Sequence, residues 1–460
     1  MIQTLTLCLL GGLTAVMAMA EALNFRRTGR VTFLTVVHLL IFIGYCLPAF
    51  VLAFLPGTGW AIPPEGLNEP NPWGTRLYLL DLADWLALAP ATYLESGLIL
   101  AGGYATMLAG YAVATRHAAP TPLASDRLPP RALAASGLVL GTVAALGLAV
   151  YSSQFDDLHH MMTEGLHIRR GNADVKWGAL QVLAQTAFPA FLILAAVALR
   201  FRGVGRTILA VAAILAWTVA AVRIFHAGGR LEAGAFFISP VLAWIFIIRS
   251  QIRSAVILAC LGLAALFLGS VDPLFFRDPL ATLSVEIASL TSAVAENVLF
   301  ILAYLGFPHL SSAHTLTVVP GEIPFRYFFD IPLGLAYMLP NFTGVETLPP
   351  MILSLHVKML PWIPVDLFSF GYYSLGTIGV LITFAAFGAL LAMFDGWLTE
   401  STGWLGQALR AVWLFYLPFR LLYADPYATL QSGFGLITGT LAIIALALWA
   451  AWRRDRSNGF

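Results

Sequence analysis

Apolar residues run in blocks of about 20 along almost the whole chain, and short polar connections separate them. A helix of that length crosses roughly 30 Å of hydrocarbon and satisfies its own backbone hydrogen bonds inside lipid. The pattern therefore predicts an all-α, polytopic integral membrane protein with about eleven transmembrane helices. The predicted spans lie near 2–22, 31–54, 92–114, 132–151, 178–199, 207–224, 233–248, 254–270, 375–394, 408–423 and 433–452.

The blocks divide one membrane domain into three stretches of sequence. Residues 1–270 hold the first eight predicted helices, 271–374 form one large external loop, and 375–460 hold the last three helices and a short tail. Within the loop, the spacing of apolar residues over Pro279–Gly306 predicts an amphipathic helix on the membrane surface. The prolines that follow, from Pro308 to Pro364, predict an irregular fold without a long helix.

Composition excludes several classes of protein. The chain is 59% hydrophobic and only 11% charged, whereas charged residues make up roughly a quarter of soluble domains, so a soluble enzyme is excluded. The net charge is +1 and no basic stripe is present, so no nucleic-acid partner is expected.

The distribution of charge predicts the orientation. When connections are assigned to alternate sides, one side receives 15 of the 25 basic residues, and the other receives 19 of the 24 acidic residues. The positive-inside rule then places the N-terminus outside and the C-terminus in the cytoplasm. Chemistry is expected on the external face, because the long loops lie there.

Charged side chains at the ends of membrane spans are costly, so each one is a functional hypothesis. The densest group lies on the predicted external hairpin after the sixth span, where Gly228 and Gly229 let a ligand approach the backbone. Arginine binds phosphate in bidentate fashion, so arginines from three external loops predict a cavity for a dianionic, lipid-linked phosphate. The alternative is that they only reach lipid headgroups. The predicted anion-binding residues are Arg223, His226, Arg230, Arg277, Arg326 and Arg420.

Metal and cofactor signatures are weak. Asp156, Asp157, His159 and His160 resemble metal ligands, but no partner cluster with ligand spacing accompanies them, so no metal is predicted. A phosphate-cradling loop with lysine and a serine-centred elbow are both absent from the sequence, so no ATP-driven transporter and no cofactor are expected.

Four short motifs, in this order along the chain, carry a family resemblance. They are Ala227–Arg230 (Ala-Gly-Gly-Arg), Ile323–Pro332, the glycine- and tyrosine-rich run Phe370–Val380, and Tyr423–Asp425. With the long external loop, they resemble the bacterial oligosaccharide repeat-unit polymerases, the Wzy-type O-antigen polymerases, and most of all the enterobacterial common antigen type.

The resemblance implies an inner-membrane glycosyltransferase of the polytopic, lipid-donor (GT-C-like) class. It would move the growing glycan from undecaprenyl pyrophosphate to the non-reducing end of a lipid-linked repeat unit on the periplasmic face. The family also implies partners in the membrane, namely a polysaccharide co-polymerase that regulates chain length and a flippase. Because the leaving group is already activated, arginines rather than a metal can stabilise it. Arg230 and Arg326 correspond to the family's motifs.

The general base stays open among several residues. Asp425 takes the place of a similarly positioned acidic residue in the family, and Glu232 follows the Arg230 turn. Either residue can act as base or orient an arginine, Arg420 and Asp425 can instead pair with each other, and His309 and His314 are alternatives. Two other functions stay open as well: an O-antigen ligase that passes the glycan to lipid A core, and a lipid-linked oligosaccharide flippase.

Overall fold

The computed structural model is a bundle of helices. It describes residues 1–54, 87–117, 122–123, 125–158, 160–161, 164, 178–227, 236, 305–337 and 365–458. All regular structure in these ranges is helical, and eight helices are long and apolar enough to cross a membrane. The chain is therefore a multi-pass helical membrane protein.

Eight of the predicted blocks form these helices, some of them from two consecutive segments. The elements are α1 (Ile2–Thr28), α2 (Phe33–Ile41) with η1 (Phe42–Cys46) and α3 (Leu47–Phe54), α5 (Pro90–His117), α6 (Pro130–Ser152), α8 (Gly178–Ala184) with α9 (Ala187–Ala198), α10 (Val204–Ala227), α16 (Leu367–Phe394) with η6 (Asp395–Thr399), and α18 (Pro426–Asn458).

Three predicted spans do not appear among the eight. Apart from Phe236, the blocks 233–248 and 254–270 lie outside the described residues. The block 408–423 corresponds to α17 (Gly403–Tyr416) and the 3₁₀ turn η7 (Pro418–Leu421). Since α17 has 14 residues, it is about 21 Å long, which is shorter than the hydrocarbon core. The helix does not extend further because Pro418 lacks the backbone N–H that the next turn needs. The total of eleven crossings stays a prediction.

The predicted external loop contains more helix than its prolines suggest. The amphipathic helix predicted over Pro279–Gly306 lies outside the described residues except for its last two, and residues 305–318 are helical and largely buried. The expectation of an irregular fold after Pro308 is therefore wrong at this point. The reason is that residues 309–319 contain no proline, which leaves room for three turns of helix.

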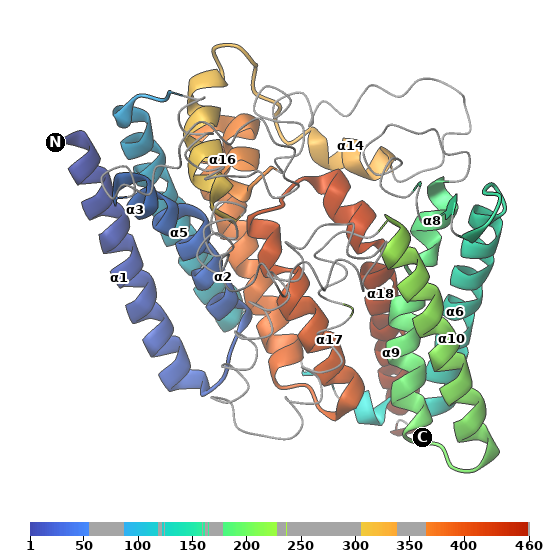
Figure 1. The fold of residues 1–460 in the computed structure, drawn as a ribbon. Coiled ribbons are helices and arrows are strands. Elements are labelled where there is room, and N and C mark those ends of the chain that lie inside the picture. The colour runs from blue at the N-terminus through green and yellow to red at the C-terminus, as the bar shows by residue number, and fades with distance from the viewer. Residues whose placement is uncertain are drawn as a thin grey trace, which may run out of the picture.

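The helices form two groups joined by α17 and α18 (Figure 1). One group contains α1, α2, α5 and α16, with α5 packed along α16, and the other contains α6, α8, α9 and α10. The helix α18 packs against α6, α8 and α9, and the short helix α14 (Asp330–Tyr337) covers the start of α18. The two termini lie at opposite ends of the bundle (Figure 1).

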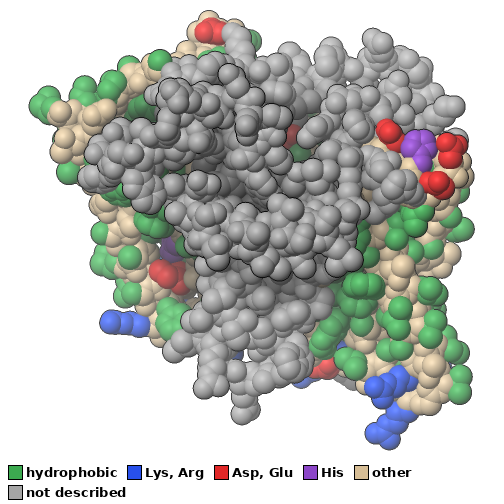
Figure 2. All heavy atoms as spheres, viewed as in Figure 1, with side chains coloured by type: hydrophobic (Ala, Val, Ile, Leu, Met, Phe, Trp, Pro, Cys, Tyr) green, Lys and Arg blue, Asp and Glu red, His purple; other side chains and the backbone are tan. Residues whose placement is uncertain are grey.

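Charged side chains also differ between the two ends of the bundle. Figure 2 shows Lys and Arg side chains at the lower end, where the C-terminus lies in Figure 1, and a group of acidic side chains at the upper right. We refer to the end with the C-terminus as the basic end and to the other as the acidic end. The asymmetry agrees with the segregation of charge along the sequence.

The helix α16 is broken near its start. Leu375 has φ −149° and ψ 29°, and Gly376 has φ 63° and ψ −149°. The break folds the first turns of α16 back on the rest, so that Gly371 packs against the backbone of Gly379 and Val380. Side chains other than the hydrogen of glycine do not fit this contact, which explains the glycine-rich motif Phe370–Val380.

We expect Gly376→Ala to destabilise the protein. The backbone angles of Gly376 are accessible essentially to glycine alone, and such a conformation costs a residue with a Cβ about 1–3 kcal/mol. An added Cβ would lie 3.4 Å from the Phe325 ring, an ordinary contact, so the cost comes from the backbone. The midpoint of thermal unfolding in detergent measures it. The control is Gly12→Ala in α1, where a Cβ meets nothing within 4 Å, and equal midpoints for the two variants would contradict the expectation.

Candidate functional site

The backbone at the break in α16 binds the motif Ile323–Pro332. It exposes the carbonyls of Tyr373 and Ser374, which accept hydrogen bonds from the backbone N–H groups of Arg326 (2.9 Å) and Tyr327 (2.9 Å). Tyr327 and Phe328 have positive φ, 52° and 59°, which is uncommon for residues other than glycine. The motif Ile323–Pro332 is thus a sharp turn held against the motif Phe370–Val380.

This turn places Arg326 beside a buried acid. Arg326 Nη2 lies 2.6 Å from Asp330 Oδ1, and the side chains are 9% and 0% exposed. The Tyr373 side chain is next to both, with its ring centroid 6.0 Å from Arg326 Cζ. Burial raises the pKa of Asp330, and the adjacent guanidinium opposes this by lowering it. The buried carboxylate of Asp330 therefore depends on the positive charge of Arg326 for its stability.

Asp425 lies at the same place in the fold, directly before α18. Its Oδ1 accepts the N–H of Tyr427 at 2.9 Å, so Asp425 caps the helix ahead of Pro426. The helix α14 meets this end of α18, since Gly334 packs against the backbone of Tyr427. The three motifs that contain Arg326, Tyr373 and Asp425 therefore meet at one point at the acidic end of the bundle (Figure 1).

The pKa of the Asp425 carboxyl group is higher than that of an ordinary aspartate. Burial raises its pKa to about 6, and the negative charge of Asp330 adds to the increase. The N–H groups of Tyr427 and Ala428 and the guanidinium of Arg420 act in the opposite direction. A carboxylate with this pKa is mostly ionised at pH 7 and is a stronger base than an ordinary aspartate.

Arg420 is held by neighbours other than Asp425. Its guanidinium carbon lies 4.2 Å from the centroid of the Tyr416 ring, and its Nη1 donates to Thr429 Oγ1 at 3.3 Å. No ion pair joins Arg420 to Asp425, so the alternative that the two side chains only pair with each other is wrong. Arg420 instead supplies positive charge to the neighbourhood of Asp425.

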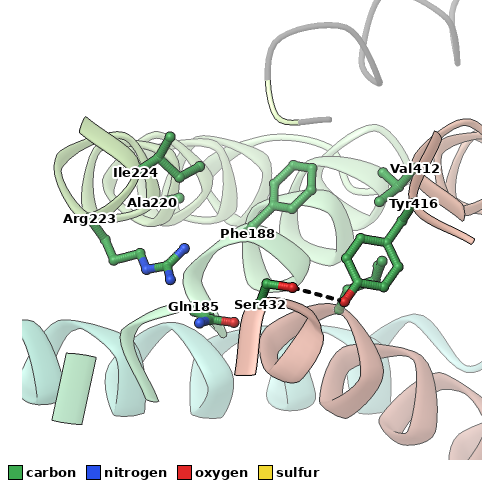
Figure 3. Close-up of a pocket in the computed structure, with 9 residues that line it drawn as sticks. Gln185, Phe188, Ala220, Arg223, Ile224, Val412, Tyr416 and Ser432 are labelled. Carbon is green, nitrogen blue, oxygen red and sulfur yellow. Dashed lines mark hydrogen bonds between the residues drawn. The ribbon is translucent and has the colours of Figure 1, made fainter. Parts of the chain in front are cut away.

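Arg223 and His226 belong to a helix and not to the predicted hairpin. The helix α10 runs from Val204 to Ala227 and so includes both residues. Arg223 lines a small cavity of about 40 Å³ with Tyr416 and Ser432, and Figure 3 shows its guanidinium directed toward the side of Ser432. The cavity has room for a few water molecules but not for a pyrophosphate.

His226 has a clear packing role. Its Nδ1 lies 2.7 Å from the Met161 carbonyl, to which it donates, and its Nε2 lies 2.8 Å from the Tyr151 hydroxyl. Both ring nitrogens are thus engaged, and the Phe155 ring lies edge-on to the imidazole at 5.8 Å. These contacts connect the end of α10 to the segment that follows α6.

The two described histidines of the long loop, His309 and His314, lie on the helix 305–318. His309 is buried in the helix 305–318 and stacks on the Tyr93 ring, with ring centroids 5.1 Å apart. Its contacts in the described ranges include neither Arg326 nor Asp425. His314 lies on the same helix and is half-buried.

Several predicted residues cannot be placed. Arg230, Glu232 and Arg277 lie outside the described residues. The acidic and histidine cluster after α6 is described in part, and His160 Nδ1 lies 3.5 Å from Asp156 Oδ2 on the surface. Within the described ranges, no group of three or more metal-ligating side chains comes together.

Tyr373 and Tyr416 were not predicted to belong to the site, and Asp330 was considered only as one of the charged residues of the long loop. Asp330 follows Arg326 by four residues, the spacing at which opposite charges meet on a helix or turn, so this signal was present. Tyr373 and Tyr416 carried no signal beyond their aromatic character, because only the fold brings them to Arg326 and Arg420.

Comparison with known proteins does not add to this description. No family profile, no curated protein and no solved structure matches the chain.

Proposed function

We propose that the protein is an oligosaccharide repeat-unit polymerase of the bacterial inner membrane. The observation that supports this is the meeting of Arg326, Arg420 and Asp425 in one cluster. They come from segments far apart in the chain, and the motifs around Arg326 and Asp425 resemble the polymerase family. The cluster lies at the acidic end of the bundle, and the positive-inside rule supports a periplasmic position for that end.

In the proposed reaction, a sugar hydroxyl of the acceptor repeat unit attacks the anomeric carbon of the glycan held on undecaprenyl pyrophosphate. A new glycosidic C–O bond forms as the bond from that carbon to the pyrophosphate oxygen breaks. Asp425 accepts the proton of the attacking hydroxyl. Arg326 and Arg420 stabilise the pyrophosphate that leaves, because fixed cations stabilise charge that develops in the transition state.

The supporting groups fit these roles. The contact with Asp330 uses only one of the five N–H donors of Arg326, so the others remain to bind phosphate oxygens. The ring of Tyr416 fixes the plane of Arg420. Arg223 of α10 adds positive charge at the small cavity that it lines with Tyr416 and Ser432.

The proposal is tested by product length on purified protein in nanodiscs. The sample receives undecaprenyl-pyrophosphate repeat units from the host and EDTA, and products are separated by size. A ladder spaced by one repeat unit supports a metal-independent polymerase. If no ladder forms but adding lipid A core yields a glycan conjugate, the protein is a ligase. If lipid-linked substrate crosses the bilayer without any transfer, the protein is a flippase.

We expect the rate of transfer to fall at acidic pH. The base must be ionised, and the pKa of Asp425 is about 6, so the ionised fraction is near its maximum above pH 7. Below pH 6 the rate should fall about tenfold for each pH unit, because protonated Asp425 cannot accept the proton. The measurement is kcat against pH from 4.5 to 8. A flat profile between pH 5 and 7 would contradict Asp425 as the base.

A further inference from the structure

An apolar groove lies at the basic end of the bundle, away from the cluster of Arg326 and Asp425. Its volume is about 630 Å³, and its walls are formed by α18, α17, the end of α16 with η6, and the residues Pro122, Leu123, Arg127 and Leu128. Leu441 and Leu448 of α18 line one side, and Trp397 and Trp413 line the other. The Trp413 Nε1–H donates to Thr440 Oγ1 at 2.9 Å, so this polar pair is satisfied within the wall.

The groove lies at the depth of the membrane. It follows α18 from Ile437 to Ala451, within the membrane-spanning part Pro426–Arg453. This length is about 21 Å, close to one leaflet with its headgroup layer, which measures about 20–22 Å. The rim faces outward, since Leu441 and Leu448 are 58% and 67% exposed.

Its size fits a lipid chain. A dry apolar cavity of about 150 Å³ binds one benzene molecule, so 630 Å³ corresponds to on the order of 25 carbon atoms. Water does not fill such a space within hydrocarbon, because the walls offer few polar partners. An acyl chain has both the length and the chemistry to fill it.

The mouth of the groove is basic. Arg127 lines it and is exposed, and the neighbouring Asp126 pairs with Arg200 at 3.2 Å. At the end of α18, Arg453 stacks on Trp449 with 4.1 Å between the guanidinium carbon and the ring centroid. A basic rim above an apolar groove, at the level of the headgroups, complements a lipid with a negative charge.

We propose that this groove is a binding site for an anionic glycerophospholipid of the leaflet at the basic end. One acyl chain lies along α18 between Leu448 and Trp413, and the phosphate is bound at Arg127. The site is independent of the proposed glycan transfer, because Asp425 precedes the first residue of α18 and the groove is lined by the second half of that helix.

Native mass spectrometry of the intact protein tests the proposal. Protein purified in mild detergent is titrated with phosphatidylglycerol or with phosphatidylcholine of the same chains, and bound lipid is counted. We expect one phosphatidylglycerol to be retained at least tenfold more strongly by the native protein than by Ala447→Trp, which fills the groove. We expect Arg127→Gln to reduce the preference for phosphatidylglycerol about fivefold, since one surface arginine contributes about that factor.

The control is Ala445→Trp, which adds the same side chain to the same helix. Ala445 is exposed and does not line the groove, so this variant should retain the lipid as the native protein does. Equal loss of lipid in the two tryptophan variants, or equal retention in both, would overturn the proposal. So would a protein dimer that replaces bound lipid and is abolished by Ala447→Trp, because the groove would then be an interface between two copies.

Discussion

Replacing Asp425 by asparagine is expected to lower kcat for glycan transfer by about 10²- to 10⁴-fold, the usual contribution of a general base. The fold should tolerate the change. Asparagine caps a helix about as well as aspartate, so the bond from the Tyr427 N–H is retained and the unfolding midpoint should be nearly unchanged. Single-turnover rates with lipid-linked repeat units, together with thermal unfolding in the same detergent, measure both effects.

Asp425→Ala separates the two roles of this residue. Alanine removes the cap as well as the base, so it should lower stability by about 1 kcal/mol and lose the same activity as asparagine. If Asp425→Asn keeps its activity while Asp425→Ala loses it, Asp425 serves only as a cap. The base would then be sought elsewhere, and Glu232, the other acidic candidate from the sequence, would be next.

The prediction of the fold from sequence succeeded where length and apolarity decide the outcome. Eight apolar blocks are long helices, because a membrane imposes helical structure on each of them. Boundaries were less accurate where no breaker was present, as in α10, which continues past the predicted end at residue 224 to Ala227. The break at Gly376 was not predicted. A glycine within an apolar run looks the same whether it sits in a straight helix or at a positive φ.

The sequence predicted which charged residues belong to the candidate site but not which side chains they contact. Arg326 was chosen from a motif of the long loop, and Arg420 and Asp425 were chosen from an external turn between two spans. In the structure, Asp330 pairs with Arg326 and also acts on Asp425, next to Arg420. The sequence did not show that Arg326 pairs with Asp330 or that Arg420 stacks on Tyr416. Those contacts depend on the broken start of α16 and on the arrangement of α17 and α18. His309 illustrates the opposite case, since burial against Tyr93 removes it from the cluster.

Arg326→Gln is expected to affect both stability and activity. Removing the guanidinium leaves Asp330 as a buried, uncompensated acid at 0% exposure, which typically costs about 3–5 kcal/mol. Loss of one cation at the leaving group is expected to lower kcat by a further 10²- to 10³-fold in the molecules that remain folded. A lower activity of this single variant therefore does not distinguish a substrate-binding arginine from a structural one.

The double variant Arg326→Gln with Asp330→Asn makes that distinction. It removes both charges and keeps two side chains of similar size, so the thermal midpoint should return to within a few degrees of the native value. If Arg326 binds the pyrophosphate, the kcat of the double variant stays 10²- to 10³-fold below the native value although its stability is restored. Arg326→Lys should give an intermediate rate, because lysine keeps the charge near Asp330 but lacks the planar pair of donors that phosphate oxygens accept. Recovery of native activity in the double variant would instead assign Arg326 to the support of Asp330 and leave the pyrophosphate to Arg420.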